Sequence, residues 1–97
     1  MKVIYKYPVG EEIDLPCDHK VLKAEYQGTE LFAWVLVDLE SETEKYKFVI
    51  KGTGHPEGLF YDEGEYVDTV FEGPYVWHIF KVKKIANGLI QSGWILS

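Results

Sequence analysis

Hydrophobic and polar residues alternate along much of the chain, and a period of two is the pattern of half-buried β-strands. In Lys20–Gln27 the alternation places Leu22, Ala24 and Tyr26 on one face, and Val21 with the polar residues on the other. Similar runs predict further strands at Val3–Tyr7, Glu11–Leu15, Lys45–Lys51, Glu65–Phe71, Tyr75–Val82 and Leu89–Leu96. Glycine, proline and asparagine separate these runs and predict the turns.

One run departs from the alternation. Leu31–Leu39 is almost continuously apolar, so we expect it to be the central strand, buried on both faces. The polar stretch Glu40–Glu44 predicts a hairpin loop, and the pair Asn87-Gly88 predicts a tight hairpin turn. Six to eight short strands with regular turns predict an all-β fold, a small antiparallel β-sandwich or open barrel. The irregular stretch Gly52–Gly64 leaves room for one short helix.

Length and composition narrow the class of protein. The 97 residues predict one domain over residues 1–97, and 46% hydrophobic content is enough to form a core. There is no apolar run long enough for a transmembrane helix, no apolar signal-peptide core, and Cys17 is the single cysteine. These features predict a soluble intracellular protein. The net charge of −6 and the absence of arginine argue against DNA or RNA as a partner.

The most distinctive motif follows the strand Lys45–Lys51. Glycines in Lys51-Gly52-Thr53-Gly54-His55 permit backbone conformations that turn N–H groups inward as an anion-binding nest. The motif lacks the ending of a nucleotide-binding P-loop, and no helix follows it as in a dinucleotide fingerprint. A ligand-binding loop and a purely structural turn therefore both stay open.

Chemistry beyond binding has little support in the sequence. His55 and His78 are the two histidines that could meet, but no spacing supplies the further ligands of a zinc site. Cys17 and His19 share a turn without an orienting acid. We therefore expect no metal, no cofactor and no catalysis. Exposed aromatic rings beside the glycine loop could stack on a base. The candidate ligand-binding residues are Lys51, Gly52, Thr53, Gly54, His55, Tyr61, Tyr75 and His78.

Several segments together resemble a family of small uncharacterised proteins of tailed bacteriophages, a domain of unknown function with a GTGH loop. The segments that carry the resemblance are IYKYPV, DLPCDHKVLKAEYQ, FAWVLVD, GTGHP, EYVDTV and VWHIF, between Val3 and Lys81. The family pattern stops shortly after the strand Tyr75–Val82. Residues 83–97 are therefore predicted to be a C-terminal extension that is atypical of the family.

The resemblance implies a phage protein in the host bacterial cytoplasm, but no established activity. We expect a homo-oligomeric accessory protein that counteracts a host function such as antiviral defence by binding. Its partner would be a small nucleotide signal, which it sequesters, or a host protein, with no DNA, RNA or membrane. A host-protein inhibitor would use the acidic surface Glu57, Tyr61, Asp62, Glu63 and Glu65. The alternatives are a structural or assembly component of the virion and a small hydrolase using His55 and His78.

Overall fold

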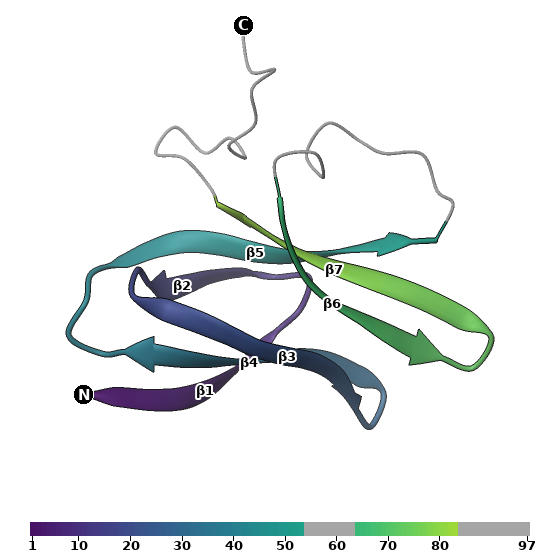
Figure 1. Ribbon diagram of the computed structural model, residues 1–97, viewed down its shortest axis with the longest axis horizontal. Helices are drawn as coiled ribbons and strands as arrows, with labels where there is room; N and C mark the ends of the chain where they lie inside the picture. Colours follow the sequence, from purple (N-terminus) through teal and green to yellow (C-terminus); the bar gives the residue numbers. More distant parts are fainter. Residues whose placement is uncertain (54–63, 84–97) are drawn as a thin grey trace, which may run out of the picture.

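Antiparallel strands make up the regular structure of the part of the chain that the structure describes (Figure 1). The computed structural model describes residues 1–53 and 64–83. Within these residues the strands are β1 (Lys2–Pro8), β2 (Glu12–Pro16), β3 (His19–Gln27), β4 (Glu30–Asp38), β5 (Thr43–Gly52), β6 (Glu65–Glu72) and β7 (Tyr75–Lys83). The all-β prediction is confirmed.

The strands form two antiparallel sheets that pack on each other (Figure 1). The three-stranded sheet has the order β1-β4-β3, and the four-stranded sheet has the order β2-β5-β7-β6. This arrangement confirms the predicted small sandwich or open barrel. β3 and β6 are edge strands of different sheets and contact each other where the sheets meet.

The core lies between the sheets and is built by alternate residues of each strand. On β4, Ala33, Val35 and Val37 are fully buried, and Phe48 of β5 and Ile79 of β7 close the core from the other sheet. β-branched and aromatic side chains suit this position because they pack well on a pleated surface. The core therefore sets which side chains of β5 and β7 face outward.

The predicted faces of β3 are wrong at its start. The register against β4 shifts between Val21 and Lys23, so Leu22 is an extra residue in a β-bulge. Leu22 is 46% exposed, whereas Val21 packs against the core together with Ala24. An inserted residue reverses every side chain before it, which a strict period of two cannot anticipate.

Two expectations about β4 are also corrected. Its inner face is buried, but Phe32, Trp34 and Leu36 on the outer face are only half-buried, so the strand is not buried equally on both faces. The segment Glu40–Glu44 is not a hairpin loop, because β4 and β5 belong to different sheets. The chain crosses there from one sheet to the other.

Some predictions fall on residues outside the described ranges. These are the hairpin at Asn87-Gly88, the strand Leu89–Leu96, most of the stretch Gly52–Gly64 in which a short helix could lie, and all but the first residue of the extension 83–97. They stay predictions. In residues 1–53 and 64–83 there is no helix long and apolar enough to cross a membrane.

Candidate functional site

A cavity opens at the end of the four-stranded sheet, where β5 stops and the β6–β7 hairpin turns. Its volume is about 460 Å³, and the described residues that line it are Gly52, Thr53, Pro74, Tyr75, Val76 and Trp77. We call it the end cavity. Gly52 is the last residue of β5 and pairs with Trp77 of β7. Because glycine has no side chain, position 52 places none beside the indole ring.

Two aromatic rings form one wall of the end cavity. Tyr75 and Trp77 lie two residues apart on β7 and therefore on one face. Their ring centroids are 5.9 Å apart, and the planes are inclined by only 22°, so the rings are stacked. Tyr75 is 60% exposed, whereas Trp77 packs against the core. The Trp77 Nε1–H donates to Glu72 Oε1 at 3.0 Å, which fixes the indole.

His78 anchors the polar side of the site. Its Nε2 lies 2.7 Å from Thr53 Oγ1, and its Nδ1 lies 3.1 Å from Thr69 Oγ1. The Tyr66 hydroxyl lies 2.6 Å from the same Thr69 oxygen. A neutral imidazole donates from one nitrogen and accepts at the other, so this chain of four side chains satisfies both. His78 therefore holds the side chains of Thr53 and Thr69 in place.

The structure brings together part of the predicted site. Gly52, Thr53 and Tyr75 line the end cavity, and His78 lies behind Thr53. Lys51 is opposite His78 in the β5–β7 register but does not line the cavity. Gly54, His55 and Tyr61 lie outside the described residues.

Three lining residues were missed in the sequence analysis: Pro74, Val76 and Trp77. Trp77 was assigned only to a strand face, because its position opposite Gly52 depends on the register between β5 and β7. The pattern that could have found it is Tyr75-x-Trp77 immediately after the Gly73-Pro74 break, which places two rings on one face at a strand end.

The predicted acidic surface is represented in the described residues only by Glu65. Its carboxylate forms an ion pair with Lys81 at 3.2 Å, and its side chain is 72% exposed. Glu57, Tyr61, Asp62 and Glu63 lie outside the described residues. The acidic docking surface therefore stays a prediction.

The hydrogen-bond partners of His19 are Pro16 and Lys81 rather than Cys17. His19 Nδ1 lies 2.6 Å from the Pro16 carbonyl oxygen, and its Nε2 lies 2.7 Å from Lys81 Nζ. Partial desolvation, followed by a hydrogen bond to Glu44, raises the pKa of the exposed Cys17 thiol. A raised pKa works against the reactive thiolate. Among the described residues no group of three or more acidic, histidine or cysteine side chains could hold a metal ion.

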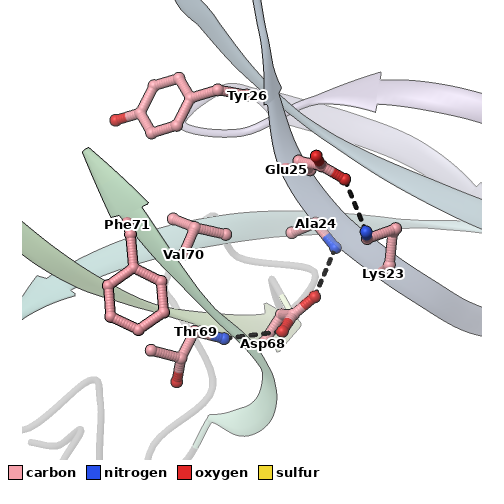
Figure 2. A pocket seen from close by; sticks show the side chains of 8 residues that line it. All are labelled: Lys23, Ala24, Glu25, Tyr26, Asp68, Thr69, Val70 and Phe71. Atoms are coloured by element: carbon pink, nitrogen blue, oxygen red, sulfur yellow. Dashed lines mark hydrogen bonds and ion pairs between the residues drawn. The ribbon is translucent and has the colours of Figure 1, made fainter. Parts of the chain in front are cut away.

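A second cavity lies where β3 faces β6 (Figure 2). Its volume is about 360 Å³, and it is lined by Lys23, Ala24, Glu25, Tyr26, Asp68, Thr69, Val70 and Phe71. We call the facing edges of these two strands the seam. Asp68 crosses the seam to accept a hydrogen bond from the Ala24 backbone N–H at 2.9 Å.

Comparison with known proteins identifies a family but not a function. The family model described as "Domain of unknown function (DUF7352)" matches residues 1–88. The chain belongs to this family. No curated protein matches the chain. No solved structure matches it either.

Proposed function

We propose that the protein acts by binding a small molecule that carries a planar ring, and that the ring enters the end cavity. The observation that carries this proposal is the Tyr75–Trp77 stack, with Tyr75 60% exposed at the mouth and Gly52 opposite the indole. Base–aromatic stacking contributes about 1–3 kcal/mol per base and tolerates different bases. A nucleobase is therefore a fitting ligand group.

Thr53 supplies the polar contact of the proposed site. Thr53 is one of the residues that line the cavity, and its hydroxyl is held by His78. When His78 donates, the hydroxyl hydrogen can point to the ligand, and when His78 accepts, the oxygen lone pairs can do so. Thr53 can thus serve a donor or an acceptor on the edge of a base.

Charge limits how the rest of such a ligand is held. The protein has a net charge of −6 and no arginine, so no guanidinium can grip a phosphate in a bidentate way. We therefore assign most of the affinity to the ring rather than to phosphate. A small nucleotide signal bound in this way fits the expected phage accessory protein that acts on its host by sequestration.

The wider biological setting rests on sequence resemblance. Phage origin, action against antiviral defence, the host bacterial cytoplasm and a homo-oligomeric state are part of the proposal. Inhibition of a host protein, a virion component and a hydrolase using His55 and His78 are the competing predictions.

Tyr75→Ala tests the site directly. A ligand is first selected by thermal shift from a panel of nucleosides, mononucleotides, cyclic oligonucleotides and ADP-ribose derivatives. A ligand at 100-fold excess over its Kd stabilises the folded protein by about 2.7 kcal/mol. We expect Tyr75→Ala to weaken the affinity for that ligand by roughly 5- to 150-fold, which is the equivalent of one lost stacking contact. Tyr5→Ala, which removes a ring of β1 that is 47% exposed, is the matched control and should leave Kd unchanged.

Two results would contradict the proposal. One is the absence of any stabilisation at millimolar concentrations across the whole panel. The other is equal binding by the wild type and Tyr75→Ala.

A further inference from the structure

β1 forms one edge of the three-stranded sheet (Figure 1). In the part of the chain that the structure describes, it pairs only with β4. The Leu39 N–H donates to the Met1 carbonyl at 2.9 Å, and the Val9 N–H donates to the Leu31 carbonyl at 3.0 Å. The odd-numbered residues of β1 therefore direct their backbone groups to β4, because this direction alternates along an antiparallel strand.

The even-numbered residues of β1 face the open side of the edge. By the same alternation, Lys2, Ile4 and Lys6 direct both N–H and C=O there, and Pro8 directs its carbonyl. Among the described residues, no strand pairs with them on that side. A row of unpaired donors and acceptors of this kind is a template for one more strand.

Large apolar side chains are exposed along the same edge. Ile4 is 58% exposed, and Tyr5 is 47% exposed. Tyr5 lies between Val3 and Tyr7 on one face of β1, and both of these neighbours pack against the core. Tyr5 thus faces the core side of the sheet but is not covered by it. A strand added to the open edge would cover both Ile4 and Tyr5.

The Lys6 side chain does not guard the open edge. Its Nζ lies 4.4 Å from the centroid of the Phe32 ring and donates to Gln27 Oε1 at 2.6 Å. Phe32 is on β4 and Gln27 is on β3, so the ammonium group extends across the sheet and away from the edge. Outward-pointing lysines are a common protection of edge strands, and Lys6 does not provide it here.

We propose that the open edge of β1 pairs with β1 of a second copy of this chain. The two strands run antiparallel about a two-fold axis at Tyr5 and join the two three-stranded sheets into one continuous sheet. A two-fold dimer is the commonest symmetric assembly and uses the same surface on both copies. This interface specifies the homo-oligomeric state that is part of the proposed function, and its evidence is independent of the end cavity.

Backbone and side chains select this register. Ile4 pairs with Lys6 of the second copy. Lys2 pairs with Pro8, whose missing N–H then falls at the end of the ladder. Tyr5 lies opposite Tyr5 of the second copy in a non-hydrogen-bonded pair, where side chains are closest and two rings can pack. An axis at Ile4 would place Lys2 opposite Lys6, and like charges directly opposite are destabilising.

The two ends of β1 carry opposite charge. Lys2 is near the start of the strand, and the exposed Glu11 and Glu12 follow its end. An antiparallel arrangement places the start of one strand beside the end of the other. Complementary charge therefore favours the antiparallel dimer over a parallel one.

Sedimentation velocity over a range of protein concentrations measures the dimer. We expect a monomer–dimer equilibrium for the wild type, with a dissociation constant that rises about tenfold or more in Tyr5→Ala, because both copies lose the ring at the axis. Tyr75→Ala is the matched control, since it removes a ring of β7 that is 60% exposed. It should leave the dissociation constant of the dimer unchanged.

Cysteine cross-linking tests the register even if Tyr5→Ala does not fold. In a Cys17→Ser background, Tyr5→Cys places two thiols opposite each other at a Cα separation of about 4.5 Å, which a disulfide can span. Oxidised glutathione takes up the two electrons and two protons as the disulfide forms. Ile4→Cys in the same background is the control, because residue 4 lies opposite residue 6. We expect a covalent dimer in severalfold higher yield for Tyr5→Cys.

Three results would overturn the proposal. The first is a wild type that stays monomeric at millimolar concentration, and the second is a dimer whose dissociation constant is the same in Tyr5→Ala. The third is a higher yield of covalent dimer for Ile4→Cys than for Tyr5→Cys. Ligand binding in the end cavity is measured separately through Tyr75→Ala, so the failure of one proposal is distinguishable from the failure of the other.

Discussion

His19 is held in a neutral form by its two contacts. The Pro16 carbonyl can only accept, so Nδ1 carries the hydrogen, and Nε2 accepts from the Lys81 ammonium group. Burial lowers the pKa of His19, and the charge of Lys81 lowers it further; the Pro16 hydrogen bond, Glu65 and Asp18 oppose this shift. Since Lys81 and Glu65 lie on the other sheet, the contact joins the two sheets.

Acid should therefore weaken the fold through His19. Because folding lowers the pKa of His19, this residue binds fewer protons in the folded chain than in the unfolded chain. The unfolding free energy therefore falls as the pH drops below about 6.5, the pKa of an unperturbed histidine. The loss levels off below the pKa of His19 in the folded chain. Urea unfolding between pH 7 and pH 5 measures the slope. His19→Gln should be less sensitive to pH in this window. Equal slopes for the two proteins would show that His19 does not carry the effect.

Leu22 and Leu15 offer a matched pair of residues. Leu22 stands in the bulge of β3 and is 46% exposed, whereas Leu15 of β2 is fully buried in the core. We expect Leu22→Ala to change the unfolding free energy by about 0.5 kcal/mol or less, and Leu15→Ala to lower it by about 2–5 kcal/mol. Urea unfolding of both variants measures the difference. A larger loss for Leu22→Ala would place Leu22 in the core after all.

At the scale of elements, side-chain contacts join β3 of one sheet to β6 and β7 of the other. Asp68 bonds to Ala24, the Tyr26 hydroxyl bonds to Glu72, and Lys81 bonds to His19. Each of these contacts joins a strand of one sheet to a strand of the other. The bulges at Leu22 in β3 and at Val67 in β6 lie close in sequence to these contacts and increase the local twist.

Asp68→Ala tests this tie. It leaves the part-buried N–H groups of Ala24 and Thr69 without their acceptor, and each unsatisfied group costs about 1–3 kcal/mol. Asp14→Ala is the control, because Asp14 forms an exposed ion pair with Lys45, which contributes about 0–1 kcal/mol. Urea unfolding should rank Asp68→Ala clearly below Asp14→Ala. Equal unfolding free energies for the two variants would show that Asp68 does not stabilise the contact between β3 and β6.

Strand positions were largely readable from the sequence, because each depends on local alternation. Sheet membership was not, since β4 and β5 are consecutive yet belong to different sheets. The faces of β3 were wrong at Val21 and Leu22 because a bulge depends on the pairing strand rather than on the strand itself. Local pattern thus gives the elements, and long-range pairing decides how they join.

At the scale of the whole molecule, local pattern predicts part of the candidate site, and long-range pairing decides the rest. Gly52, Thr53 and Tyr75 were expected near one another and do line one cavity. Trp77 completes the aromatic wall only because the antiparallel register brings it opposite Gly52. The end cavity and the cavity at the seam have different linings, with aromatic rings in one and strand edges in the other.

The most direct test of the proposed function is a heteronuclear NMR titration with the nucleobase-bearing panel. We expect the Trp77 indole N–H and the amides of Gly52 and Thr53 to shift together and saturate with a single Kd. Trp34, on the outer face of the three-stranded sheet, is an internal control and should stay unchanged. Absence of any shift at millimolar ligand, or shifts confined to Trp34 and its neighbours, would contradict a ring-binding site in the end cavity.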